Sequence, residues 1–274
     1  MTRVVNAPIR VAIAGAGGRM GQVLIELTLQ SSKLKFGAAL EQEQSPLLGC
    51  DAGARIGHPT GILISSNIDE AMRGSDVLID FTRPCGTLRH AEVCADHGCA
   101  MVIGTTGFSE DEKAALAQYA GKVPMVIASN MSVGVTVLKR LVEFAAKRLG
   151  SGYDVEIVEI HHKHKVDAPS GTALLLGEAA AAGMGVQLKD KAIFAREGVT
   201  GERPVGAIGF ATLRGGDVVG EHTVVFCGEG ERVELTHRAG SRRNFAAGAL
   251  RAAEFVVAQE KTGVYSMEDV LGLS

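Results

Sequence analysis

The sequence IRVAIAGAGGRMGQVLIELTL, residues 9–29, decides the fold of the first part of the chain. Residues 9–14 form a short apolar run that ends at Gly15, as expected of a strand buried on both faces of a parallel sheet. Residues 21–29 have helical character and follow the glycines directly. We therefore predict a strand, a tight turn and a helix, which together begin a doubly wound α/β domain.

The turn between these two elements is rich in glycine, and this composition favours a phosphate-binding loop. Glycines let the backbone bend sharply and approach a pyrophosphate, while the N–H groups at the start of the helix attract the anion. Glu41 follows a second predicted strand at 34–40 and lies 20 residues after Gly21, where an acceptor for ribose hydroxyls is expected. An ordinary glycine turn is the alternative. The predicted dinucleotide contacts are Gly15, Ala16, Gly17, Gly18, Arg19, Met20 and Glu41.

Further strands are predicted at 76–81, 100–103 and 124–128, with helices at 87–97 and 109–119 between them. Strands that alternate with helices of this length indicate a doubly wound parallel sheet, whose ligands bind at the carboxyl ends of the strands. Small residues after the last two strands leave room for a nicotinamide ring, although simple turns are the alternative. These predicted contacts are Gly104, Thr105, Thr106, Ala128, Ser129, Asn130 and Met131.

The pattern changes after about residue 130 and predicts an open mixed or antiparallel sheet that carries two helices. A helix is predicted at 136–149, with its apolar face at Leu138, Leu141, Val142, Ala145 and Leu149. The strand predicted at 153–160 alternates apolar Val155, Ile157 and Ile160 with polar Glu156 and Glu159. The other predicted elements are a strand at 207–213, a hairpin of 218–226 with 232–237, a long loop at 183–204 and a terminal helix at 245–258.

The segment HHKHKVDAPSGTA, residues 161–173, contains three histidines and two lysines within its first five positions and directly follows a predicted strand. Pro169 and Ser170 mark the start of a helix, so the N–H groups of Gly171 and Thr172 would face a carboxylate or a phosphate. Histidine is the side chain best suited to donate a proton near neutral pH. The segment therefore predicts a site for an anionic substrate that also receives a proton.

Two other interpretations of this segment remain open from the residues alone. The histidines would suit zinc, but the sequence has no HExxH spacing and Lys163 and Lys165 would repel a cation, so we predict no metal. A solvated run of charges is the second alternative, and the adjoining helix start argues against it. The five cysteines are odd in number and lack CxxC spacing, which favours small buried side chains over disulfides or a zinc site.

Composition excludes several classes of protein. The chain has 274 residues, of which 46% are hydrophobic and 22% charged, a balance that excludes disordered and coiled-coil proteins. A net charge of −3 and an aromatic content of 4% without Trp argue against a nucleic-acid partner. The sequence contains no run of 18 apolar residues and no signal-peptide pattern, so we expect no membrane span and predict a cytoplasmic location.

Taken together, these motifs resemble the dihydrodipicolinate reductase family, also called the 4-hydroxy-tetrahydrodipicolinate reductases. The resemblance extends over essentially the whole chain and rests on GAGGRMG at 15–21, DFT at 80–82, GTTGF at 104–108, ASN at 128–130 and the segment 161–172. It implies hydride transfer from NADH or NADPH, which reduces 4-hydroxy-tetrahydrodipicolinate to tetrahydrodipicolinate in lysine and diaminopimelate biosynthesis.

The resemblance also implies how the chain is divided and which residues act. A dinucleotide-binding domain would comprise residues 1–130 with 241–274, and a substrate-binding and tetramerisation domain residues 131–240. By motif position, His161 would be the general acid and Lys165 a second proton donor that binds a carboxylate. The implied substrate ligands are His162, Gly171 and Thr172. The expected partners are a small dicarboxylate substrate and further copies of the chain in a homotetramer.

Position 42 departs from the family pattern. Many members carry Arg directly after the acidic residue at the end of the second strand, but this chain has Gln42. Because an amide carries no positive charge, we expect use of both cofactors with a preference for NADH. The alternatives in function are another NAD(P)-dependent amino-acid dehydrogenase, such as an aspartate dehydrogenase, and a dinucleotide-sensing module without activity.

Overall fold

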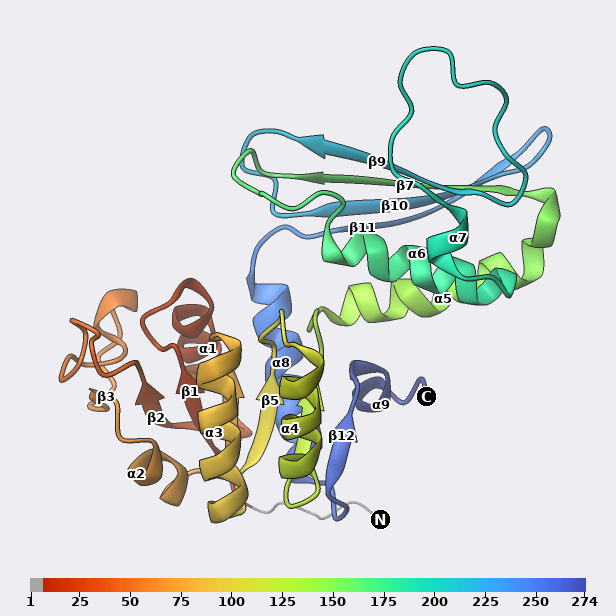
Figure 1. The fold of residues 1–274 in the computed structure, drawn as a ribbon. Coiled ribbons are helices and arrows are strands. Elements are labelled where there is room, and N and C mark those ends of the chain that lie inside the picture. Colours follow the sequence, from red (N-terminus) through yellow and green to blue (C-terminus); the bar gives the residue numbers. More distant parts are fainter. Residues whose placement is uncertain (1–6) are drawn as a thin grey trace. The chain divides into compact units, whose positions relative to one another are not determined.

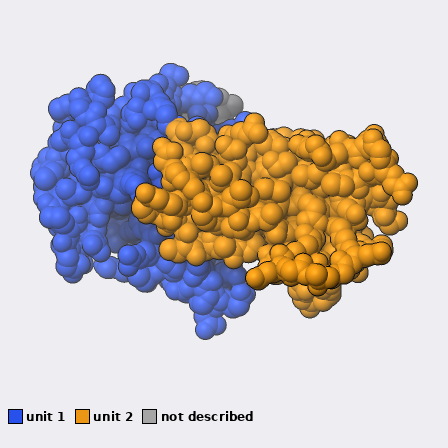
Figure 2. Space-filling model, turned by 90° about the horizontal axis from the view of Figure 1, so that it is seen from above, with its two compact units in different colours: residues 1–132, 242–274 blue, residues 133–241 orange. Residues whose placement is uncertain are grey.

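The computed structural model describes residues 7–274 and divides this part of the chain into two compact units (Figure 1). The first unit comprises the residues up to Ser132 together with Arg242–Ser274, and the second comprises Val133–Ser241 (Figure 2). The first unit is therefore discontinuous in sequence, because the chain leaves it after Ser132 and returns at Arg242.

The first unit is built on seven parallel strands in the order β12-β6-β5-β4-β1-β2-β3. The strands are β1 (Ile9–Ala14), β2 (Leu34–Leu40), β3 (Ile64–Ser65), β4 (Val77–Asp80), β5 (Ala100–Ile103), β6 (Pro124–Ile127) and β12 (Gly263–Tyr265). The strand order reverses direction between β1 and β4, as in a doubly wound, Rossmann-like sheet. The fold class predicted for this part of the chain is confirmed.

Helices cover both faces of this sheet (Figure 1). One face carries α1 (Arg19–Leu29) and α8 (Arg243–Val257), and the other carries α2 (Ile68–Arg73), α3 (Pro84–His97) and α4 (Glu110–Ala120). Successive residues of a strand point to opposite faces, and Ala12 and Ile13 of β1 are both fully buried. This burial on two sides explains the apolar run that begins the sequence motif.

The second unit carries a five-stranded mixed sheet in the order β11-β10-β7-β9-β8, in which β7 is parallel to β9 and antiparallel to β10. Its elements are α5 (Val133–Leu149), β7 (Asp154–His161), α6 (Gly171–Met184), α7 (Leu188–Lys191), β8 (Ala192–Ile193), β9 (Ile208–Arg214), β10 (Glu221–Cys227) and β11 (Arg232–Arg238). α5 and α6 pack together on one face, where Val142, Leu176 and Phe226 are fully buried. The predicted open mixed sheet with two helices is confirmed.

Several predicted elements differ from the structure. α8 is not the terminal element, because β12 and α9 (Met267–Leu271) follow it. The stretch 183–204 is not a single loop, since α6 continues to Met184 and is followed by α7 and β8. The short elements β3 and α2 were not predicted. Elements of two to six residues show no hydrophobic period, and α6 is apolar on all sides, so pattern alone does not reveal these bounds.

Two expectations about burial are also corrected. On α5, Leu141 is 48% exposed rather than buried with Leu138 and Val142. Cys94 and Cys99 are buried free thiols, whereas Cys50 and Cys85 are exposed. Helical or strand spacing assigns a residue to a face, but the packing of neighbouring elements decides how much of that face is covered.

The alternation predicted for β7 is wrong in its second half. Val155, Ile157, Glu159 and His161 form one buried face of the strand, and Ile160 lies on the opposite, partly exposed face. The strand keeps a strict period of two, so a carboxylate and an imidazole continue an apolar row into the interior. Burial of Glu159 is tolerated because Arg214, His161 and Ser170 all form hydrogen bonds with its carboxylate.

Candidate active site

The loop that joins β1 to α1 has a backbone that favours glycine. Gly15 adopts a φ of +68°, a left-handed conformation, and its carbonyl oxygen accepts a hydrogen bond from the Gly18 N–H at 2.9 Å. A Cβ atom on Gly21 would lie 2.2 Å from that same oxygen. The loop therefore brings the start of α1 close to the end of β1, as a pyrophosphate cradle requires.

Glu41 follows β2 and lies beside this loop, where its Oε1 accepts a hydrogen bond from the Gly17 N–H at 2.9 Å. Glu41 and the glycine loop border a cavity of about 750 Å³. It lies at the carboxyl ends of β1, β2 and β4, where the strand order of the sheet reverses. The lining residues include Gly15, Gly18, Glu41, Gln42, Phe81, Thr82, Arg83, Arg89 and His90. A glycine-lined cavity of this size and position fits a dinucleotide.

The other predicted cofactor residues lie along the same edge of the sheet. Residues 104–106 follow β5 and residues 128–131 follow β6, the next two strands beyond β4. A Cβ atom on Gly104 would lie 2.2 Å from the Phe81 ring, so this glycine allows two strand ends to approach closely. Met131 is buried, and Asn130 Oδ1 accepts a hydrogen bond from the Ser132 N–H at 2.8 Å. These two segments share the edge but do not line the cavity.

A buried carboxylate to which we assigned no role from the sequence lies next to the cavity. Asp80, at the end of β4, is fully buried, and its Oδ2 lies 2.7 Å from Nδ1 of His90, which borders the cavity. Asp80 Oδ1 accepts hydrogen bonds from the Thr82 N–H at 2.8 Å and the Thr82 hydroxyl at 2.7 Å. The Thr105 hydroxyl joins the same network, so its side chain helps to order the strand ends.

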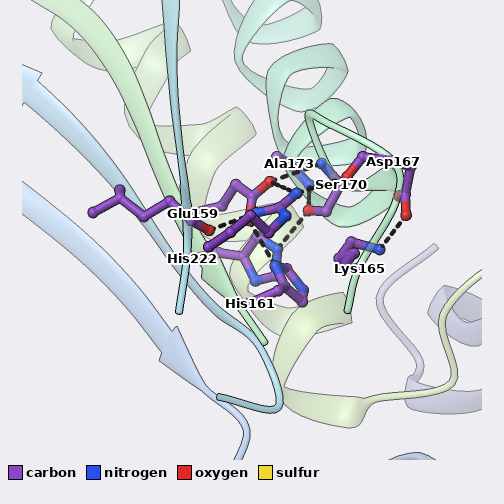
Figure 3. Close-up of polar contacts among 9 residues, drawn as sticks. Glu159, His161, Lys165, Asp167, Ser170, Ala173 and His222 are labelled. Carbon is purple, nitrogen blue, oxygen red and sulfur yellow. Dashed lines mark hydrogen bonds and ion pairs between the residues drawn. The ribbon is translucent and has the colours of Figure 1, made fainter. Parts of the chain in front are cut away.

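The predicted catalytic residues, His161 and Lys165, lie at the carboxyl end of β7 and in the turn that follows it (Figure 3). His161 is the last residue of β7, and its Nδ1 lies 2.6 Å from Oε2 of Glu159. Arg214, at the end of β9, donates hydrogen bonds to the two carboxylate oxygens of Glu159 at 2.8 and 2.9 Å. The imidazole is therefore held at one nitrogen by a buried carboxylate that is itself fixed.

Lys165 lies in the turn that follows β7, where its N–H donates to the His162 carbonyl oxygen at 3.1 Å. Its Nζ is 2.8 Å from Oδ1 of Asp167. The hydrogen bond from Lys165 lowers the pKa of Asp167, so this carboxylate stays ionised at neutral pH. Arg214 also donates to the Asp167 carbonyl oxygen at 2.7 Å, which connects the Lys165 turn to the carboxylate that holds His161.

The start of α6 lies next in the chain after the end of β7 and the Lys165 turn. Ser170 caps the helix, because its Oγ accepts a hydrogen bond from the Ala173 N–H at 3.1 Å. Gly171 and Thr172 are the first two residues of α6, where the helix dipole places partial positive charge. His162 lies in the turn after β7, with its ring centroid 6.2 Å from that of His164. The structure thus brings the predicted substrate residues into one region of the second unit.

His222 of β10 packs against this region from the neighbouring strand. Its Nε2 lies 2.9 Å from the Ser170 Oγ, and its ring meets the His161 ring edge-on with centroids 5.0 Å apart. Burial, followed by the positive field of His161, lowers the pKa of His222 to about 4. The His222 side chain is therefore neutral at pH 7.

The free energy of unfolding is expected to fall as the pH drops from 6.5 to 4, with His222 as one cause. The pKa of His222 is about 4 in the folded protein and 6.5 when unperturbed, so the unfolded state binds this proton more tightly in that interval. The difference corresponds to at most about 3 kcal/mol. Urea unfolding at pH 7.5 and pH 5 should show a smaller loss for His222→Gln than for the wild type. An equal loss in the two proteins would remove His222 as a cause.

Within residues 7–274, no three His, Cys, Asp or Glu side chains form a group suited to a metal ion. Histidines 161 and 162 do not converge with His164 on one point: His161 contacts Glu159, whereas His162 lies against His164. No helix in the same part of the chain is both long and apolar enough to cross a bilayer.

Three residues around His161 were missed by sequence reasoning. Glu159 lies two residues before His161 on the same strand, so a strict period of two along β7 would have placed both side chains on one face. Arg214 and His222 come from β9 and β10, where the register sets Arg214 opposite His161 and His222 opposite Glu159. No local signal in the sequence predicts that register.

Comparison with known proteins finds similarity to one family along nearly the full chain. Residues 9–131 match the N-terminal region of dihydrodipicolinate reductase, and residues 134–271 match its C-terminal region. A 4-hydroxy-tetrahydrodipicolinate reductase of Herminiimonas arsenicoxydans is 53% identical over 265 residues, which cover 97% of this chain and 98% of the relative. Its counterpart in Nitrosomonas eutropha is 55% identical with the same coverage of both chains.

Solved structures with the same fold include a dipicolinate-bound dihydrodipicolinate reductase from Paenisporosarcina sp. TG-14, with a TM-score of 0.75 and 24% identity. The match covers 94% of this chain and 97% of that one. An amine dehydrogenase from Mycobacterium smegmatis shares the fold more distantly, with a TM-score of 0.59, 13% identity and 96% coverage of both chains. On the strength of the two regional matches and the full-length relatives, the chain belongs to the dihydrodipicolinate reductase family.

Proposed function

We propose that this chain reduces 4-hydroxy-tetrahydrodipicolinate to tetrahydrodipicolinate with NADH or NADPH as hydride donor. Family membership along nearly the full chain supports the proposal, as does the name of its curated relatives. The observation that carries it is the segment from His161 to Lys165, where a carboxylate-held imidazole and an ammonium group precede the start of a helix. Such a group of residues suits an anionic substrate that also receives a proton.

The first unit would hold the dinucleotide. The glycine loop of residues 15–20 would bind the pyrophosphate through backbone N–H groups, and the Glu41 carboxylate would accept hydrogen bonds from ribose hydroxyls. Residues 104–106 and 128–131, at the ends of β5 and β6, would bind the nicotinamide end. When bound, the reduced nicotinamide supplies the hydride.

The second unit would bind the substrate and supply the proton. His161 would donate the proton, while Lys165 would bind a substrate carboxylate as a point charge and serve as a second donor. His162 and the N–H groups of Gly171 and Thr172 would hold the substrate in place. The overall reduction adds a hydride and a proton to the substrate and releases its hydroxyl group as water.

A coupled assay tests this function. A synthase generates the substrate in the cuvette, and NADH absorbance reports turnover by the purified chain. Oxidation of NADH that depends on the synthase product is the expected result. Turnover of oxaloacetate with ammonia would instead identify an aspartate dehydrogenase, and cofactor binding without turnover of either compound would identify a sensing module.

Cofactor preference is expected to respond to position 42. Gln42 borders the cavity together with Arg83 and Arg89, and the Arg89 guanidinium lies 3.6 Å from the Glu43 carboxylate. These two cations would partly offset the repulsion between Glu41 and a 2′-phosphate, so both cofactors would serve with a preference for NADH. Gln42→Arg should raise kcat/KM for NADPH by about tenfold or more, because one added hydrogen bond to a charged group is worth roughly 1.5–3 kcal/mol.

Steady-state kinetics with both cofactors would measure this change. The value of kcat/KM for NADH should remain nearly constant. Gln44→Arg, in the same loop and on the same cavity, controls for a general increase in positive charge. A strong preference of the wild type for NADPH, or no gain from Gln42→Arg, would mean that the ribose pocket lies elsewhere.

The second unit would also form the contacts of a homotetramer. Its sheet carries α5 and α6 on one face only (Figure 1). The opposite face presents apolar side chains on three adjacent strands, namely Val158, Ile160, Ala211, Leu213 and Val225. Leu213 is 46% exposed in the single chain, and pairing of this face with a second copy would bury it. Light scattering would give the mass of a tetramer for the wild type and a smaller species for Leu213→Lys.

A further inference from the structure

The Glu159 carboxylate is fixed by four hydrogen bonds from three residues (Figure 3). Arg214 Nη1 donates to Oε2 at 2.8 Å, and Nη2 donates to Oε1 at 2.9 Å. The Ser170 N–H also donates to Oε1 at 3.0 Å, and His161 Nδ1 lies 2.6 Å from Oε2. Because each oxygen takes part in two hydrogen bonds and the residue is 1% exposed, the carboxylate is held facing His161.

Glu159 is also an anion at neutral pH, and therefore only accepts hydrogen bonds. Burial by itself raises the pKa of this carboxyl group, but hydrogen bonds from Arg214, His161 and the Ser170 N–H outweigh burial and bring the pKa below its ordinary value. A carboxylate with no proton of its own requires a donor at the facing ring nitrogen. The Nδ1 atom of His161 must then carry a hydrogen.

We infer that Glu159 is the positioning residue of this site: it keeps a proton on Nδ1 of His161, so that Nε2 is the ring nitrogen that exchanges its proton with the substrate. The inference rests on the proposed role of His161 as proton donor. Arg214 contributes by holding the carboxylate. Its hydrogen bond to the Asp167 carbonyl oxygen also connects Glu159 to the turn that carries Lys165. Glu159 thus acts on the reaction through His161.

The surroundings of Nε2 fit this assignment. A Cβ atom on Gly220, in the connection between β9 and β10, would lie 2.7 Å from Nε2, so only a residue without a side chain can lie this close to the ring without contacting that nitrogen. The His222 ring meets His161 edge-on and stays neutral at pH 7, so it does not compete for the Glu159 carboxylate as a cation. Nδ1 is therefore bound to Glu159, while the glycine at position 220 places no side chain against Nε2.

Nitrogen NMR of histidine-labelled protein tests the inference without any activity measurement. The His161 signals, assigned by their absence in His161→Gln, should show the Nδ1–H tautomer once the ring is neutral in the wild type. Glu159→Gln should lose this single tautomer, because an amide can either donate to Nδ1 or accept from it. A neutral ring that carries its proton on Nε2 in the wild type would overturn the inference.

Kinetics provides the second readout. Glu159→Gln is expected to lower kcat roughly 10²-fold, with the Kd for NADH within twofold of the wild type, since a wrong tautomer affects proton transfer. Glu156→Gln is the matched control, because Glu156 lies on the same strand, faces the other side and is also bound by arginines, Arg196 and Arg203. Equal losses of kcat in the two variants would reduce Glu159 to a structural ion pair and contradict the inference.

The two readouts also separate this inference from the proposed function. If His161→Gln keeps its turnover while the wild type shows the Nδ1–H tautomer, the proposed proton donor is wrong but the action of Glu159 on the ring stands. If His161→Gln loses turnover while the wild type shows the Nε2–H tautomer, the donor stands and the role of Glu159 is wrong. Should Glu159→Gln fold poorly, the tautomer of the wild type still decides.

Discussion

Replacing His161 with Gln is expected to lower kcat by roughly 10²–10⁴-fold, the usual contribution of a general acid. The Kd for NADH should not change, because the residues proposed to bind the dinucleotide, the glycine loop and Glu41, belong to the other compact unit. Gln is the suitable replacement because its amide can still donate a hydrogen bond to the buried Glu159 carboxylate, which limits the cost in stability. Stopped-flow or steady-state turnover, together with a fluorescence titration of NADH, would separate the two effects.

His164→Gln is the matched control for this experiment, since His164 lies three residues further along the same segment and is exposed. It should keep turnover within a few-fold of the wild type. Near-normal kcat in His161→Gln would remove this residue from the reaction. A parallel loss in both histidine variants would point to the charge of the segment as a whole.

Replacing Lys165 with Met should lower kcat/KM roughly 10²-fold, because a hydrogen bond to a charged group contributes about 1.5–3 kcal/mol and binding and turnover both depend on it. Met keeps most of the side-chain volume but removes the ammonium group. Pyridine-2,6-dicarboxylate, a planar dicarboxylate, should compete with the substrate in the wild type and lose affinity in the variant. Initial rates at several inhibitor concentrations would give both constants.

Two controls define the outcome for Lys165. Lys163→Met removes an exposed positive charge from the same turn and should leave KM unchanged. Asp167→Asn removes the other half of the ion pair, and so measures how much of the loss comes from the pair itself. If Lys165→Met retains both kcat and KM, Lys165 is a surface charge. If the dicarboxylate does not compete in the wild type, the substrate belongs to another class.

The sequence predicts the first unit well because each signal there is local. Residues 9–14 are mostly apolar because both faces of β1 are buried. The glycines that follow are needed because backbone atoms only a few residues apart in sequence come too close for a side chain. The spacing of Ser109 and Glu112 is likewise a local signal for a helix start, and at α4 the structure contains both hydrogen bonds of the resulting capping box. Strand, turn and helix follow from neighbours in sequence.

The candidate site is less predictable because its partners are set by strand register. His161 and Lys165 stand out by composition, but Glu159 resembles an outward-facing residue of an amphipathic strand until Arg214 is known to lie beside it. Arg214 reaches that place through the parallel pairing of β7 with β9, which are separated by the whole of α6 to β8. Burial of a carboxylate such as Glu159 can be predicted only once the cation that pairs with it is known, because an unpaired buried charge is strongly destabilising.

The discontinuity of the first unit has a consequence for synthesis on the ribosome. Strands β1 to β6 are synthesised before the second unit, but α8, whose Ala249, Ala253 and Val256 are fully buried, and the edge strand β12 are synthesised after it. The second unit is continuous and has all of its residues outside the exit tunnel before α8 appears. Until α8 has been synthesised, the face of the first unit's sheet that α8 covers stays exposed, and exposed apolar surface on a nascent chain promotes aggregation.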